Sequence, residues 1–306
     1  MWTTLNDSLC ELGESPFWHP HERSLYWLDI PGRAVLRTRG EIEHPVVERW
    51  VLPTEPGCMA PAARGGLVIA LRDGIYRAHA WGGPLTALAR ADYDVRSMRF
   101  NDGKCDPQGR FWAGTLNEAK DRPSGALYCL DARGGDVPRL TRMAEGVTTA
   151  NGLAFVPEAA TLYWADTAAH RVSAWDWDPA TNRLSHPRMF RQFESRPEGW
   201  SPASAERYQG RPDGATVDAE GCYWVAMFEG GQLLRFSPEG EQVAALPVPV
   251  QCPTMPCFGG DDLRTLFVTS ARRGRPADEI EQRPASGYVI ALRAEVAGTP
   301  VHFFED

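Results

Sequence analysis

Short apolar runs alternate with turn residues along the entire chain. Valine, isoleucine, leucine and aromatic residues gather in brief segments bounded by glycine, proline, asparagine or aspartate. The 306 residues include 29 glycines and 25 prolines, which interrupt the sequence too often for a sustained 3.6-residue periodicity. Brief apolar runs between turn residues are typical of β-strands. The pattern therefore predicts an all-β protein.

One apolar run recurs six times, as the second strand of a repeated unit: residues 25–28, 66–69, 110–113, 162–165, 222–225 and 266–269. A third run follows in most units, and a weaker fourth run follows in some. A spacing of about 40–60 residues is typical of propeller blades, which have four strands each. We therefore predict a six-bladed β-propeller with one central metal site, formed as a single domain over residues 1–306. A propeller needs a closed ring, so we expect the N-terminal segment to pair with the last blade near residues 301–304.

A polar residue opens the first strand in four of these units. These residues are Glu14, Asn101, Asn151 and Asp213. First strands line the channel of a propeller, so equivalent opening positions converge at one end of the axis. The second and sixth units carry no acid there and are expected to supply an apolar wall.

Two carboxylates and two carboxamides at one place suggest a bound cation, because carboxylates brought together without one repel each other. Oxygen donors without cysteine or histidine fit calcium, magnesium or manganese. Each dipeptide alone is also an ordinary turn signal, so the argument depends on the common register of all four. Arg99 lies two residues before Asn101 and thus on the same face of that strand. It is a candidate for substrate binding.

Composition argues against several classes of function. The net charge of −8 argues against a nucleic-acid partner, which needs a basic face. No run of 18 apolar residues and no signal peptide are apparent, and the seven cysteines are scattered without a CxxC pair. We expect a cytoplasmic protein with free thiols, no membrane contact, and a monomeric or weakly self-associating state. Residues 194–210 form the longest interruption, and Trp200 and Tyr208 favour a partial lid.

The motifs resemble the SMP-30/gluconolactonase (regucalcin-like) family over essentially the full chain. They are 12-LGESP-16, 26-YWLDI-30, 99-RFNDGK-104, 151-NGL-153 and 212-PDG-214. The resemblance implies a six-bladed propeller with one divalent cation, of a kind that differs among members and includes zinc and ferrous iron.

The resemblance also assigns roles to residues. It implies that Glu14, Asn151 and Asp213 are the metal ligands, and that Asp213 is also the acid/base. It implies that Arg99 and Asn101 contact the substrate. Glu118 is the nearest match to an acidic substrate contact in the loop after residues 114–115.

We therefore predict a hydrolase that opens a sugar lactone, such as a glucono-, xylono- or arabinolactone, to its aldonic acid. The cation would polarise the lactone carbonyl, and Asp213 would accept a proton from the attacking water. Two alternatives remain open. One is an organophosphate or aryl-ester hydrolase on the same fold, and the other is a calcium-binding regulatory protein in which the cation only stabilises the propeller.

Overall fold

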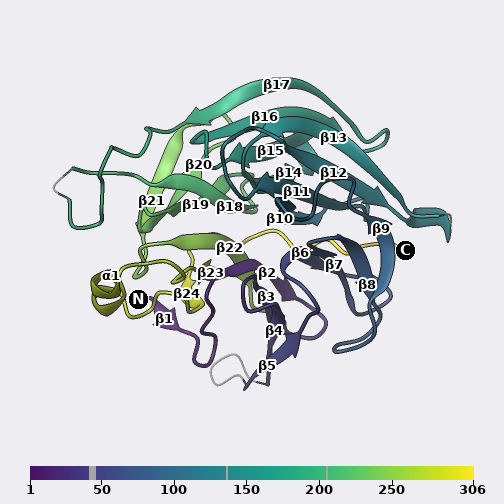
Figure 1. Cartoon of the computed structure of the whole chain (residues 1–306), viewed down its shortest axis with the longest axis horizontal. Helices are drawn as coiled ribbons and strands as arrows, with labels where there is room; N and C mark the ends of the chain where they lie inside the picture. Colours follow the sequence, from purple (N-terminus) through teal and green to yellow (C-terminus); the bar gives the residue numbers. More distant parts are fainter. Residues whose placement is uncertain (41–45, 136, 205) are drawn as a thin grey trace.

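The computed structural model describes residues 1–40, 46–135, 137–204 and 206–306. Six four-stranded antiparallel sheets surround a central axis, with the first strand of each sheet innermost (Figure 1). The predicted six-bladed β-propeller is confirmed. Apolar runs became strands because each blade packs both faces against its neighbours, which leaves most first and second strands buried throughout.

The first three blades follow the chain in order. Blade I consists of β2 (Gly13–His19), β3 (Ser24–Asp29), β4 (Ala34–Arg39) and β5 (Val46–Val51). Blade II consists of β6 (Pro56–Pro61), β7 (Leu67–Leu71), β8 (Gly74–Ala78) and β9 (Thr86–Arg90). Blade III consists of β10 (Met98–Cys105), β11 (Phe111–Asn117), β12 (Gly125–Asp131) and β13 (Arg139–Val147).

The remaining blades complete the ring. Blade IV consists of β14 (Ala150–Val156), β15 (Thr161–Asp166), β16 (Arg171–Asp178) and β17 (Arg183–Gln192). Blade V consists of β18 (Arg211–Val217), β19 (Tyr223–Phe228), β20 (Gln232–Phe236) and β21 (Gln242–Pro247). Blade VI consists of β22 (Pro253–Gly259), β23 (Thr265–Ser270), β24 (Ile290–Arg293) and β1 (Thr3–Thr4). Helical structure in the described ranges comprises α1 (Ala277–Gln282) and 3-10 turns at Arg133–Gly135 and Pro157–Ala159.

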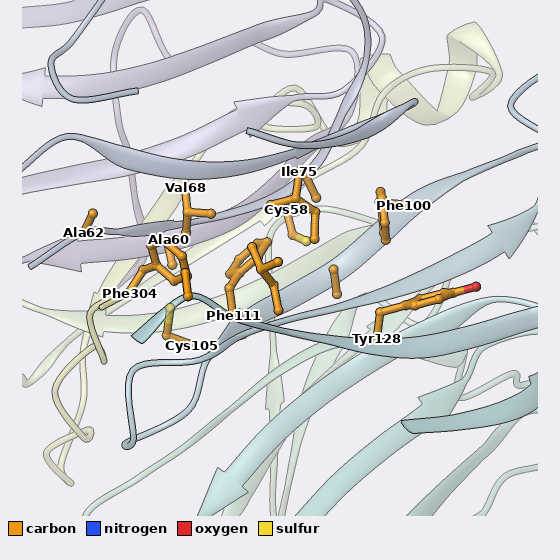
Figure 2. Close-up of a cluster of buried hydrophobic side chains, with 14 of the residues drawn as sticks. Cys58, Ala60, Ala62, Val68, Ile75, Phe100, Cys105, Phe111, Tyr128 and Phe304 are labelled. Atoms are coloured by element: carbon orange, nitrogen blue, oxygen red, sulfur yellow. The ribbon is translucent and has the colours of Figure 1, made fainter. Parts of the chain in front are cut away.

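The N-terminal strand closes the ring, as expected, but its pairing partner was predicted wrongly. β1 pairs with β24, and the amide of Leu5 continues the contact by donating to the Val289 carbonyl. Residues 301–304 instead lead to blade II, where Phe304 forms a parallel bridge with Ala62. The physical reason is the Phe304 side chain, which is fully buried in the apolar cluster between blades II and III (Figure 2).

The repeated Asp-x-x-Gly turns have a structural explanation. Asp106 accepts hydrogen bonds from Trp112 Nε1 at 2.8 Å and from Arg110 Nε at 2.6 Å. Asp218 accepts from Trp224 Nε1 at 2.7 Å in the equivalent hairpin of blade V. Each buried carboxylate thus fixes the tryptophan that packs between blades. The Asp–Trp spacing of the repeat belongs to the fold rather than to the site.

Every blade also carries a break in the register between its first and second strands. The breaks lie at 14/17, 56/58, 100/103, 151/154, 212/215 and 253/255. A β-bulge redirects the side chains beside it. The opening residues identified in the sequence lie at these breaks, so the bulge is what turns them toward the axis.

All seven cysteines are buried free thiols, as expected. No helix within the described ranges is long and apolar enough to cross a membrane.

Candidate functional site

Four side chains from the bulges gather at one end of the axis. Glu14 comes from β2, Asn101 from β10, Asn151 from β14 and Asp213 from β18. All four are buried, with no more than 7% of the residue exposed. The residues come from blades I, III, IV and V, so only the closed ring brings them together.

A chain of hydrogen bonds links blades III, IV and V at this point. Arg99 Nη1 donates to Asn101 Oδ1 at 2.8 Å, and Asn101 Nδ2 donates to Asn151 Oδ1 at 2.9 Å. Asn151 Nδ2 then donates to Thr167 Oγ1 at 2.7 Å. Thr167 donates its own proton to the Pro212 carbonyl at 2.7 Å. We call these residues the amide chain.

The amide chain fixes the orientation of Asn151. Because the Thr167 hydroxyl donates to a carbonyl, its oxygen must accept from Asn151, and the Asn151 oxygen therefore faces Asn101. That oxygen has a second lone pair left for a ligand. Asn101 donates its other amide proton to the Ala150 carbonyl at 2.9 Å, so its own oxygen is what remains for a substrate hydroxyl.

The carboxylates of the site lack cationic partners. Across the described ranges, neither Glu14 nor Asp213 forms an ion pair, and Asp102 Oδ1 is buried without a hydrogen-bond donor. Burial, followed by the charges of Asp213 and Asp102, raises the pKa of Glu14 well above its ordinary value. Burial and then the charge of Asp102 raise the pKa of Asp213 to about 8, against the opposing charge of Arg211.

This donor set fits a hard divalent cation. Two buried carboxylates and one amide oxygen offer three oxygen ligands from Glu14, Asn151 and Asp213, and a dication would neutralise both negative charges. No cluster of three or more His, Cys, Asp or Glu side chains suited to a metal occurs in the part of the chain that the structure describes. The third candidate ligand, Asn151, is an amide, which explains why acidic residues alone do not outline the site.

Arg99 and Glu118 lie at the rim of this site. Arg99 also donates to the Phe100 carbonyl at 2.9 Å, and its Nε lies 4.0 Å from Glu118 Oε1. Glu118 is mainly held by Arg72, whose Nη1 and Nη2 donate to its two oxygens at 3.0 and 2.8 Å. Hydrogen bonding to Arg72 lowers the pKa of Glu118, so the side chain is a charged acceptor. The two residues remain candidates for substrate binding.

Other loop residues have mainly structural roles. Asp166 caps the turn before β14 by accepting from the amides of Thr148 and Thr149. His170 is hydrogen-bonded to the Tyr208 hydroxyl at 2.8 Å, which ties residues 206–210 to blade IV. The segment between β17 and β18 extends away from the centre of the ring in Figure 1. The described residues of this segment, 193–204 and 206–210, do not cover the axis in that view, in contrast to the expected partial lid.

Sequence reasoning missed Asp102 and Lys104 as parts of the site. Asp102 accepts from the Leu153 amide at 2.9 Å, and its charge raises the pKa of both Glu14 and Asp213. Lys104 Nζ donates to the Ala215 carbonyl at 2.7 Å, and its charge lowers the pKa of Asp102 against the effect of burial. Both residues belong to the motif 101-NDGK-104 that the sequence analysis identified. The bulge that turns them inward, however, is visible only in the structure.

The sequence also matches a known protein family over most of its length. The profile of the SMP-30/Gluconolactonase/LRE-like region matches residues 12–272. A 6-deoxy-6-sulfogluconolactonase of Pseudomonas putida is 41% identical over 291 residues, which cover 94% of this chain and 92% of the relative. Regucalcin of Xenopus laevis is 33% identical over 291 residues, which cover 92% of this chain and 90% of the relative.

A solved structure agrees in fold. The crystal structure of a calcium-binding protein, regucalcin, from Agrobacterium tumefaciens superposes with a TM-score of 0.86 at 26% identity, covering 98% of this chain and 96% of that one. The sequence motifs, the propeller and these similarities agree with one another. The chain belongs to the SMP-30/gluconolactonase/LRE-like family.

Proposed function

We propose that this protein is a divalent-cation-dependent sugar lactonase. The observation that carries the proposal is the pair of buried carboxylates, Glu14 and Asp213, neither of which forms an ion pair within the described ranges. Support for a lactone substrate comes from the relative named 6-deoxy-6-sulfogluconolactonase, which matches nearly the full length of both chains. We propose a six-carbon aldonolactone as substrate and its aldonic acid as product.

Glu14, Asn151 and Asp213 would hold the cation. When bound, the cation would polarise the lactone carbonyl and stabilise the negative charge that develops on it. The amide chain prepares this arrangement, because it holds the Asn151 oxygen in one orientation before any ligand arrives.

Asp213 would move the proton in this reaction. Its carboxylate accepts a proton from the attacking water as the water oxygen bonds to the lactone carbonyl carbon. The bond between that carbon and the ring oxygen then breaks, and Asp213 returns the proton to the departing oxygen, which becomes a hydroxyl. Arg99 Nε and Nη2 and the free lone pair of Asn101 Oδ1 would orient the sugar hydroxyls.

The test is a pH-drop assay on chelator-treated protein. Glucono-, xylono- and arabinolactones are offered while calcium, magnesium, manganese, zinc or ferrous iron is added back singly. We expect cation-dependent acid release that falls at least about 100-fold in Asp213→Asn. The matched control is Asp261→Asn, which removes an exposed carboxylate paired with Arg23.

A second candidate is calcium binding without catalysis, because the Agrobacterium tumefaciens structure is described as that of a calcium-binding protein. Tight calcium binding by a folded protein that opens no lactone above the spontaneous rate would favour this candidate. Faster turnover of a phosphotriester or aryl ester than of every lactone would instead favour an esterase of the same fold.

A further inference from the structure

Two cationic side chains stand beside the site without a hydrogen-bond acceptor. Neither the Arg211 guanidinium nor the Lys120 ammonium group donates a hydrogen bond to any residue in the described ranges. Both act on the charge of Asp213, since both lower its pKa. Their donors are available to a ligand that occupies the same end of the axis.

Arg211 is held in place, but its N–H groups have no hydrogen-bond acceptor within the described ranges. It lies two residues before Asp213 in blade V, just as Arg99 lies two residues before Asn101 in blade III. Its guanidinium carbon lies 5.1 Å from the centre of the Phe228 ring, and Nη2 lies 3.4 Å from Glu229 Oε2. Stacking on an aromatic ring orients a guanidinium while leaving its N–H groups free.

The nearby carboxylate cannot neutralise Arg211 alone. Glu229 is 3% exposed at its side chain and also contacts Arg196 at 3.7 Å and Arg275 at 3.0 Å. Arg275 has a second carboxylate in Glu279. Three guanidinium groups therefore share two carboxylates, and one positive charge is left over.

Lys120 adds to this surplus. It lies in the loop after β11, two residues beyond Glu118, and forms no ion pair in the described part of the chain. Desolvation lowers the pKa of Lys120, the charge of Arg211 lowers it further, and the charge of Asp213 opposes both. Glu118 Oε1 lies 4.0 Å from Arg99 Nε, so the loop that carries Lys120 borders the same site. In a chain with a net charge of −8, such a local positive surplus indicates an anionic ligand.

We propose that Lys120 and Arg211 bind an anionic substituent on the sugar lactone, such as a sulfonate, phosphate or carboxylate on its terminal carbon. The inference rests on the proposed lactonase function and names the substrate class of that same site.

The chemistry of the two ends of the lactone supports this assignment. The terminal carbon is attached to the ring carbon next to the departing ring oxygen, so a lactone whose departing oxygen takes its proton from Asp213 brings that carbon to the side of the site where Arg211 lies two residues before Asp213. Neutral hydroxyls need no full charge. Lys120 has no ion pair in the described ranges and Arg211 shares Glu229 with two other arginines, so an anion would offset the remaining positive charge. A sulfonate or phosphate offers three oxygens to the donors of Arg211 and Lys120.

The first experiment compares kcat/KM for three lactones that differ at the terminal carbon. Gluconolactone is neutral at that carbon, whereas 6-sulfogluconolactone carries a sulfonate and 6-phosphogluconolactone carries a phosphate there. We expect the wild type to prefer an anionic lactone by more than about 10-fold. In Lys120→Gln and Arg211→Gln, the ratio of anionic to neutral kcat/KM should fall about 10- to 100-fold.

Arg122→Gln is the matched control, because it removes one positive charge from the same exposed loop. It should leave the ratio within a factor of about 2, as expected for a screened surface charge. A wild type that turns over gluconolactone as well as both anionic lactones overturns the inference and leaves the lactonase proposal intact. An equal loss for neutral and anionic lactones in Lys120→Gln also overturns it.

A binding measurement separates this inference from the proposed function. Calorimetry on the cation-loaded protein compares 6-phosphogluconate with gluconate, which share the acid end and differ only at the terminal carbon. Tighter binding of 6-phosphogluconate that Lys120→Gln abolishes supports the anion site even if no lactone is turned over. Equal affinities overturn the anion site, whereas a lack of lactone turnover alone overturns the catalytic proposal.

Discussion

Asn101 donates its amide proton to Asn151 Oδ1 across 2.9 Å, and this hydrogen bond joins blade III to blade IV beside the candidate cation. The oxygen that would ligate the cation is therefore oriented by a residue of another blade. Thr167 completes the arrangement from the other side of Asn151. The candidate site is thus built between blades.

Thr167→Val removes the hydroxyl that holds the Asn151 amide nitrogen. Loss of such a supporting hydrogen bond typically weakens cation binding by about 10- to 100-fold, and we expect a loss of that size here. Titration calorimetry with calcium or manganese on chelator-treated protein measures it. Thr149→Val is the control, because the Thr149 hydroxyl is buried without a hydrogen-bond partner in the described ranges. Equal cation affinities in both variants would contradict the role of the amide chain.

Glu14→Gln should stabilise the cation-free protein. It removes one of the buried negative charges of the site, so at pH 8 in chelator the free energy of unfolding should rise on the order of 1 kcal/mol. A cation at 100 times its Kd should add about 2.7 kcal/mol to the wild type and almost nothing to the variant. Urea denaturation with and without cation measures both effects. If Glu14→Gln gained as much from the cation as wild type, Glu14 would not be a ligand.

Phe304→Ala should destabilise the whole propeller. The side chain is fully buried between blades II and III, and truncation of such a phenylalanine costs about 3–5 kcal/mol. Urea denaturation gives the difference, and Glu305→Ala is the exposed neighbour that serves as control. A cost below about 1 kcal/mol would show that the C-terminal segment is not part of that core.

The pH dependence of stability should reveal the pair of Arg72 and Glu55. Burial alone would raise the pKa of Glu55, but hydrogen bonds with its own backbone, Thr54 and Arg72 outweigh burial and bring it to about 2. A folded-state pKa below the ordinary 4.5 stabilises the protein above that pH, and this contribution disappears as the pH falls toward 2.

The stability advantage of wild type over Glu55→Gln should therefore be largest above pH 5 and shrink steadily toward pH 3. Chemical denaturation across that range measures it, with Glu241→Gln as an exposed control. A difference that is constant with pH would exclude the charged pair.

The sequence predicted the ring and its polar positions because both are local patterns repeated in each blade. The Trp112 and Trp224 hairpins recur almost unchanged, and four opening residues share a register. Contacts between blades could not be predicted from the sequence. Phe304 is an ordinary apolar residue in the sequence, and only packing decides that it fills blade II rather than blade VI.

The same limit applies to the site. Asp102 was visible as a turn residue, but its burial depends on the bulge after Phe100. Arg211 was visible as a charge, but its unfilled donors depend on how Glu229 divides its oxygens among three arginines. Sequence patterns identify which residues face the axis, whereas the partners that each residue lacks are found only in three dimensions.

The bulge in every first strand has a consequence for engineering this protein. A ligand can be exchanged at blades I, III, IV or V by replacing the side chain that the bulge already aims at the axis. Blades II and VI do not allow this kind of side-chain exchange. A Cβ on Gly57 would lie 2.4 Å from the Phe100 carbonyl carbon, and the Thr254 hydroxyl already donates to the Gly13 carbonyl at 2.6 Å. Redesign for a different metal or reaction should therefore vary four positions of the ring and leave the other two untouched.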